Sequence, residues 1–236
     1  MNSFYSLFKK YIFTNIKDLP KNTIIIIYGS TAYGIVNNDL DVVFILETCS
    51  NELYKNIEKN IINFQKENHM QIDVEVPYSN KLVYTYDEIN NILNYTLFKK
   101  SNGEYNITPV IVNNEYFSSV EMKKRLLINI LTTYSKTISG KKSIINNYKK
   151  LAWENIIKIV SSYNSLKLIN VDEFINLLYF DKKTNSKGED YLGYKSNNPK
   201  LKRHLRKCIL KTLKDLEKDN FVLRKDKKNY IICEGD

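Results

Sequence analysis

Two aspartates separated by one residue, Asp39 and Asp41, are the side chains of this sequence best suited to catalysis. They lie at the start of an apolar run, residues 40–46, and alternate side chains of a β-strand share a face, so both carboxylates are expected on one side. Neighbouring carboxylates repel each other, and burying them is costly unless a cation lies between them. Mg²⁺ prefers oxygen ligands and takes phosphate oxygens as further ligands. The pair therefore predicts a site for two Mg²⁺ ions beside a phosphate-bearing substrate.

A glycine and a serine precede this pair. Gly29 and Ser30 follow the apolar run of residues 24–28, and eight residues separate Ser30 from Asp39. Gly-Ser is also a common turn dipeptide, which is the alternative interpretation of this pair. Where such a turn leads into a helix, backbone N–H groups face outward and favour an anion. The two residues are therefore expected to hold phosphate groups.

A third carboxylate follows in residues 71–76, where polar and apolar residues alternate as in a β-strand. Asp73 and Glu75 fall on the same face of that expected strand, and both are candidates for the same role. A carboxylate there can share the metal that binds an acceptor hydroxyl and take up its proton.

This arrangement resembles the polymerase-β nucleotidyltransferase superfamily, and in particular its small bacterial antibiotic-nucleotidyltransferase members. The matching features are Gly-Ser, a spacer, Asp-x-Asp, and an aspartate between two apolar residues, which falls on Asp73; they cover residues 24–78, about a quarter of the chain. The resemblance implies an α+β fold: a polymerase-β-like catalytic domain with a mixed sheet and helices, followed by a C-terminal helical domain. It implies an enzyme that transfers a nucleoside monophosphate from an NTP, expected to be ATP, to an acceptor hydroxyl and releases pyrophosphate.

The same resemblance assigns roles to five residues. Asp39, Asp41 and Asp73 are expected to be catalytic and to bind the two Mg²⁺ ions, and Gly29 and Ser30 to hold the β and γ phosphates.

Two adjacent lysines complete the expected site. Small nucleotidyltransferases of this kind often place a basic residue from the helical domain on the triphosphate, and Lys149 or Lys150 is the candidate here. An ordinary surface lysine is the alternative for each of them.

The order of apolar patterns divides the chain into two parts. Residues 1–117 combine expected strands at 24–28, 40–46, 72–76 and 107–112 with expected helices at 4–16, 52–67 and 86–93. Ser50 is expected to cap the helix at 52–67. Residues 118–236 show successive helical stripes, so they are expected to form the helical substrate-binding domain.

The chain is basic, with 36 Lys and Arg against 26 Asp and Glu, a net charge of +10. A basic surface suits nucleic acid, but a chain rich in Lys, Asn, Ile and Tyr is also typical of an AT-rich genome. The helix expected from residue 199 to 219 carries seven cations away from its apolar stripe, and a solvated face is preferred over a nucleic-acid track for them. These residues are Lys200, Lys202, Arg203, Arg206, Lys207, Lys211 and Lys214.

The sequence says less about the acceptor molecule than about the reaction. A small, antibiotic-like molecule is favoured over RNA because no RNA-binding region is evident, and protein nucleotidylylation ranks third. A nucleotide-binding regulator that does not catalyse the reaction is the alternative from another functional class.

The three separated cysteines predict no disulfide framework, and no apolar run approaches ~20 residues, so a cytoplasmic protein without a membrane partner is expected.

Overall fold

A mixed four-stranded sheet combines three strands from the first half of the chain with one from the second half. In this computed structural model, which describes residues 2–32, 40–72, 81–93, 98–101, 104–107, 119–163, 165–178 and 199–233, the fold is α+β, as the sequence predicted. The strands are β1 (Ile24–Ile27), β2 (Val42–Leu46), β3 (Val83–Thr85) and β6 (Lys136–Ser139), in the order β3-β2-β1-β6. β1 pairs antiparallel with both β2 and β6, whereas β2 and β3 run parallel.

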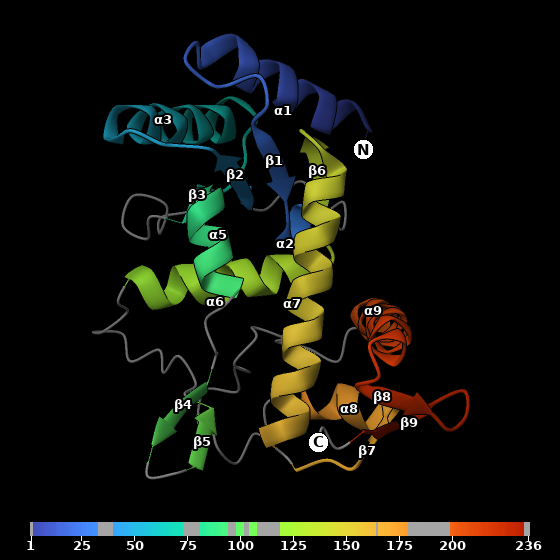
Figure 1. The fold of residues 1–236 in the computed structure, drawn as a ribbon. Helices are drawn as coiled ribbons and strands as arrows, with labels where there is room; N and C mark the ends of the chain where they lie inside the picture. Colours follow the sequence, from blue (N-terminus) through green and yellow to red (C-terminus); the bar gives the residue numbers. More distant parts are fainter. Residues whose placement is uncertain are drawn as a thin grey trace.

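Both faces of this sheet are buried, which explains why its central strands are apolar at every position. Because side chains alternate along β1, Ile24 and Ile26 pack into one core cluster, and Ile25 and Ile27 pack into the other. The helices α1 (Asn2–Asn15) and α3 (Asn51–Glu67) contribute side chains to the cluster that contains Ile25 and Ile27. Figure 1 shows them together at one end of the molecule.

The predicted cap of α3 is confirmed. The Ser50 hydroxyl accepts a hydrogen bond from the backbone N–H of Leu53 at 3.1 Å, so it satisfies a donor that the first helical turn leaves unpaired.

Three further elements follow the sheet's third strand. They are the helix α5 (Tyr86–Leu93), a separate hairpin of β4 (Phe98–Ser101) and β5 (Glu104–Ile107), and the helix α6 (Ser119–Thr132). The strand expected at residues 72–76 cannot be compared, because residues 73–80 lie outside the described part of the chain.

The C-terminal part is not wholly helical. After β6 it consists of α7 (Lys142–Tyr163), β7 (Leu168–Asn170), α8 (Val171–Leu177), α9 (Pro199–Lys218), β8 (Val222–Arg224) and β9 (Asn229–Ile232). The last three strands form a second, antiparallel sheet in the order β7-β9-β8. Strands of three or four residues are too short to produce a clear alternating pattern, so the helical stripes dominated the sequence analysis.

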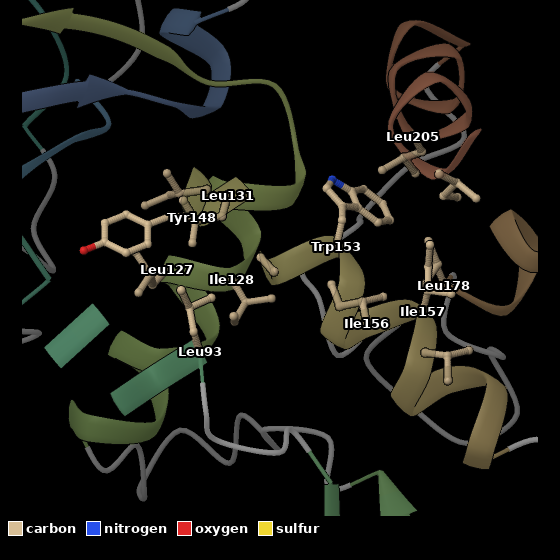
Figure 2. Packing of buried hydrophobic residues seen from close by; sticks show 14 of the residues in the cluster. Leu93, Leu127, Ile128, Leu131, Tyr148, Trp153, Ile156, Ile157, Leu178 and Leu205 are labelled. Atoms are coloured by element: carbon tan, nitrogen blue, oxygen red, sulfur yellow. The ribbon is translucent and has the colours of Figure 1, made fainter. Parts of the chain in front are cut away.

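One apolar cluster connects the sheet with the C-terminal helices. It includes Ile24 and Val43 from the sheet, Tyr148 and Trp153 from α7, and Leu205 from α9. Figure 2 shows Tyr148 on the side of α6 and Trp153 facing Leu205, so α7 is buried from both sides. The domain boundary at residue 117 stays a prediction; β6, which follows it in sequence, completes the first sheet.

Within the described residues, no helix has the length and apolar character needed to cross a membrane.

Candidate functional site

The end of β1 brings the Gly-Ser pair against one of the two aspartates. Ile27 pairs with Val42, and one residue beyond each, the backbone N–H of Tyr28 donates to the carbonyl of Asp41 at 3.0 Å. The strand expected at residues 40–46 therefore begins two residues later, with Asp41 immediately before it. This pairing places Asp41 opposite the Tyr28–Gly29 segment.

Gly29 and Asp41 are in direct contact. Gly29 has a φ of +60°, and a Cβ atom built on it would lie 1.9 Å from Oδ2 of Asp41. A side chain at this position would thus be strained by its backbone conformation and would displace the carboxylate. Glycine is favoured here for two independent reasons, and the second one allows a half-buried carboxylate to lie close to the backbone.

Ser30 contributes a hydroxyl that is buried yet unpaired. Residues Gly29–Ala32 form the single-turn helix α2, and the Oγ atom of Ser30 has no hydrogen-bond partner among the described residues. Buried hydroxyl groups are normally paired, so this one is available to a bound group. The helix is held from behind by Tyr5, whose hydroxyl donates to the carbonyl of Thr31 at 2.9 Å.

Lys136 is a cation beside this site that the sequence analysis missed. It pairs with Ile27 at the start of β6, so it lies across β1 from the strand that carries Asp41. Its Nζ atom lies 3.8 Å from the ring centroid of Tyr5, a cation–π contact. No local signal marked it, because it follows a helical stripe and opens a strand that the sequence pattern did not predict.

The structure distinguishes the two candidate lysines of α7. Nζ of Lys149 donates to Oγ of Ser135 at 2.8 Å, and Ser135 directly precedes Lys136. Lys150 is exposed and pairs instead with Glu154, one turn away, at 3.4 Å. Only Lys149 is therefore connected to the segment that leads into β6.

The surroundings of Lys149 also affect its pKa. Burial lowers its pKa, and the neighbouring Cys208 acts in the opposite direction. Sγ of Cys208 lies 3.5 Å from Nε2 of His204, whose ring meets that of Tyr134 edge to face at a centroid distance of 6.0 Å. Burial and the charge of Lys149 lower the pKa of His204.

Asp39, Asp73 and Glu75 lie outside the described residues, so their part in the site stays a prediction. Among the residues that are described, no three His, Cys, Asp or Glu side chains are grouped so as to hold a metal ion. Asp41 is the one expected metal ligand whose position is described.

No protein-family model, curated protein or solved structure matches this chain.

The described part of the site combines groups of opposite charge around the end of one strand. Asp41 supplies carboxylate oxygens on the β2 side of β1, and Lys136 supplies an ammonium group on the β6 side. Carboxylate oxygens suit a hard cation, and ammonium groups suit phosphate oxygens. Such a site can bind a metal–phosphate complex.

Proposed function

We propose that this protein is a metal-dependent nucleotidyltransferase of the polymerase-β type. It transfers a nucleoside monophosphate from an NTP, with ATP as the expected donor, to an acceptor hydroxyl and releases pyrophosphate. The proposal is supported above all by the contact between Gly29 of the Gly-Ser pair and Asp41 of the Asp-x-Asp pair. The pairing of β1 with β2 brings the two motifs together although eight residues separate them, and a side chain at residue 29 would have to displace the Asp41 carboxylate.

The donor set fits Mg²⁺. Asp41 presents hard oxygen atoms beside a backbone that cannot crowd them, and Asp39 and Asp73 are proposed to supply the remaining carboxylates for two ions. When bound, the two ions neutralise charge on the triphosphate and activate the acceptor hydroxyl. The role of Asp73 could instead fall to Glu75, two residues along.

The chain's own groups position the nucleotide. The unpaired hydroxyl of Ser30 can donate a hydrogen bond to a phosphate oxygen, and the backbone at Gly29 allows a close approach. The ammonium groups of Lys136 and Lys149 offset negative charge from the side opposite Asp41. Positioning and charge neutralisation supply most of the rate in phosphoryl transfer, so these groups, together with the metal ions, require no covalent intermediate.

A small hydroxyl-bearing molecule remains the proposed acceptor, as the sequence analysis favours. RNA and protein hydroxyl groups are the alternatives to be included in the assay.

The experiment is a pyrophosphate-release assay with Mg²⁺, each of the four NTPs, and acceptors from three classes: an antibiotic panel, RNA and cell extract. We expect release with at least one NTP, and Asp41→Asn is expected to abolish it while the thermal melt stays close to that of the wild type. Asp18→Asn, the same chemical change at an exposed position, is the matched control and should retain full activity.

Two results would contradict the proposal. One is the absence of pyrophosphate release by the wild-type protein with every NTP and acceptor class. The other is an Asp41→Asn activity within about tenfold of the wild type, because loss of a metal-binding charge should cost more than this. Asp39→Asn, assayed in parallel, tests the same metal site if the Asp41 variant melts early.

A further inference from the structure

The outward face of α9 is uniformly cationic. The side of this helix that faces the core carries Leu201, Leu205, Ile209, Leu213 and Leu216. Opposite that side, six exposed residues recur at intervals of three or four, and all six are basic: Lys200, Arg203, Lys207, Lys211, Lys214 and Lys218. Residues with this spacing share one face, an arc of about 80°, and extend along about 27 Å of the helix.

Few of these charges are offset by neighbours. Lys218 pairs with Asp215 at 3.1 Å, but within the described residues the four central cations, Arg203, Lys207, Lys211 and Lys214, form no ion pair. A solvated helix face usually mixes the two signs of charge, because opposite charges one turn apart attract and like charges repel. A row of like charges held by a firmly packed helix therefore favours a polyanionic partner.

A second group of cations lies on the hairpin next to α9. The turn between β8 and β9 carries Lys225, Lys227 and Lys228, all exposed, and it follows Arg224; of these, Lys228 forms an ion pair with Asp172 at 3.1 Å. The turn is structured, since Oδ1 of Asp226 accepts the backbone N–H groups of Lys228 at 2.8 Å and of Asn229 at 3.0 Å. The one carboxylate of the turn, that of Asp226, thus accepts hydrogen bonds from the backbone of the turn itself.

The hairpin is attached to α9. The backbone N–H of Arg224 donates to a carboxylate oxygen of Glu217, the last acidic residue of α9, at 3.4 Å. In Figure 1 the turn projects from the molecule beside α9. Among the described residues, the three strands of this sheet pair in the order β7-β9-β8, and β8 directly follows α9 in the chain.

We infer that this protein binds duplex DNA, with the outward face of α9 in the major groove and the β8–β9 turn on the adjacent phosphates. An α-helix about 10–12 Å across fits the major groove of B-DNA, which is about 12 Å wide. The major groove of duplex RNA is too narrow for it. Single-stranded nucleic acid is bound largely by stacking on aromatic rings, and α9 contains no Phe, Tyr or Trp. This inference is independent of the nucleotidyltransferase proposal.

The test is fluorescence anisotropy of the full chain with a labelled DNA duplex of about 20 base pairs, roughly two helical turns. The same sequence as duplex RNA and as single-stranded DNA gives the comparison, and each titration is repeated from low to moderate salt. Four to six phosphate contacts should lower the affinity for duplex DNA by about 10²–10³ between about 50 and 200 mM salt. Duplex DNA is expected to bind tighter than either comparison.

Charge-matched variants locate the surface. Changing Arg203, Lys207, Lys211 and Lys214 to Ala should weaken DNA binding at least about tenfold. The slope of log affinity against log salt concentration should also become shallower, by the equivalent of up to about four phosphate contacts. Lys225→Ala with Lys227→Ala should have a smaller effect in the same direction. The control removes four exposed lysines from elsewhere in the chain, at positions 9, 10, 17 and 21, and should bind nearly as the wild type does.

Three outcomes would overturn the inference. They are no binding of duplex DNA at low salt, tighter binding of either comparison nucleic acid, and equal losses for the α9 variant and its control, which would indicate attraction by net charge alone. If the fourfold variant does not fold, Lys207→Glu provides the same comparison with one substitution. Asp41→Asn should bind DNA as the wild type does, so failure of the enzymatic proposal would leave this result unaffected.

Discussion

At Gly29 the absence of a side chain determines where a carboxylate can lie. The positive φ of Gly29 and the approach of Asp41 Oδ2 are separate constraints at one residue: the first disfavours a Cβ atom, and the second leaves no room for one unless the carboxylate moves. This close approach requires that the surrounding strands hold both segments in place. Here the pairing of β1 with β2 does so, which connects the sheet directly with the chemistry proposed for Asp41.

We expect Gly29→Ala to lower the free energy of unfolding by about 2–4 kcal/mol, the sum of a left-handed backbone cost of about 1 kcal/mol and a steric cost. Denaturant unfolding measures the change. In an Asp41→Ala background, where the displaced carboxylate is absent, the same substitution should cost less. Equal costs in the two backgrounds would show that Asp41 is not the neighbour that matters.

His204 provides a residue-scale prediction for pH. Burial and the charge of Lys149 lower its pKa below the ordinary value of about 6.5. On acidification the unfolded chain therefore takes up this proton first, so the contribution of His204 is fully present above about pH 6.5 and stability falls as the pH drops below it. His204→Gln should lose less stability than the wild type between about pH 7.5 and 5.5 in parallel denaturant titrations. Stability curves that remain parallel across this range would contradict the shift.

At the scale of elements, Asn170 joins three elements of the C-terminal part of the chain, β7, α8 and β9. It ends β7, and its Oδ1 atom accepts the backbone N–H groups of Asp172 at 3.0 Å and of Glu173 at 3.2 Å at the start of α8. Its side-chain amide also donates to Oδ1 of Asn229 at 2.9 Å. One side chain thus caps a helix and cross-links the sheet on which α9 and its hairpin depend.

Replacement of Asn170 by Ala should cost about 1–2 kcal/mol in the free energy of unfolding, because the cap and the cross-strand hydrogen bond are lost together. Ser50→Ala, which removes a cap with one hydrogen bond at an exposed helix start, is the control and should cost about 1 kcal/mol or less. Chemical denaturation gives both values. A larger loss for Ser50→Ala would contradict the linking role of Asn170.

At the scale of the whole molecule, the apolar core predicts a single unfolding transition. The cluster that contains Ile24 of the first sheet also contains Leu205 of α9, so the first sheet and the C-terminal helices share one core. Trp153, the chain's one tryptophan, lies in this cluster and faces Leu205 (Figure 2). Its fluorescence therefore reports on the packing of α9 against α7.

We expect Trp153 fluorescence and far-ultraviolet circular dichroism to follow coincident denaturation curves. Leu205→Ala should lower the free energy of unfolding obtained from either curve by about 2–5 kcal/mol, because it leaves a cavity at a fully buried position. Leu7→Ala, at a side chain that is 51% exposed, should change stability by about 0.5 kcal/mol at most. Separate transitions for the two probes would show that the C-terminal part unfolds by itself.

The sequence alone was sufficient for features that depend on neighbours along the chain. The apolar strands β1 and β2, the helices α1 and α3 and the cap at Ser50 follow from periodicity and local hydrogen bonding. The sequence also predicted that Gly29 and Asp41 belong to one site; the structure shows them in contact, and the site itself stays a proposal.

Contacts between distant segments could be decided only by the tertiary structure. The pairing of β6 with β1 brought Lys136 to the site, and the packing of α7 separated Lys149 from Lys150. The burial of one side of α9 likewise turned a list of basic residues into a single outward face. These features depend on strand register and helix orientation, which are set by long-range packing and leave no periodic signal in the local sequence.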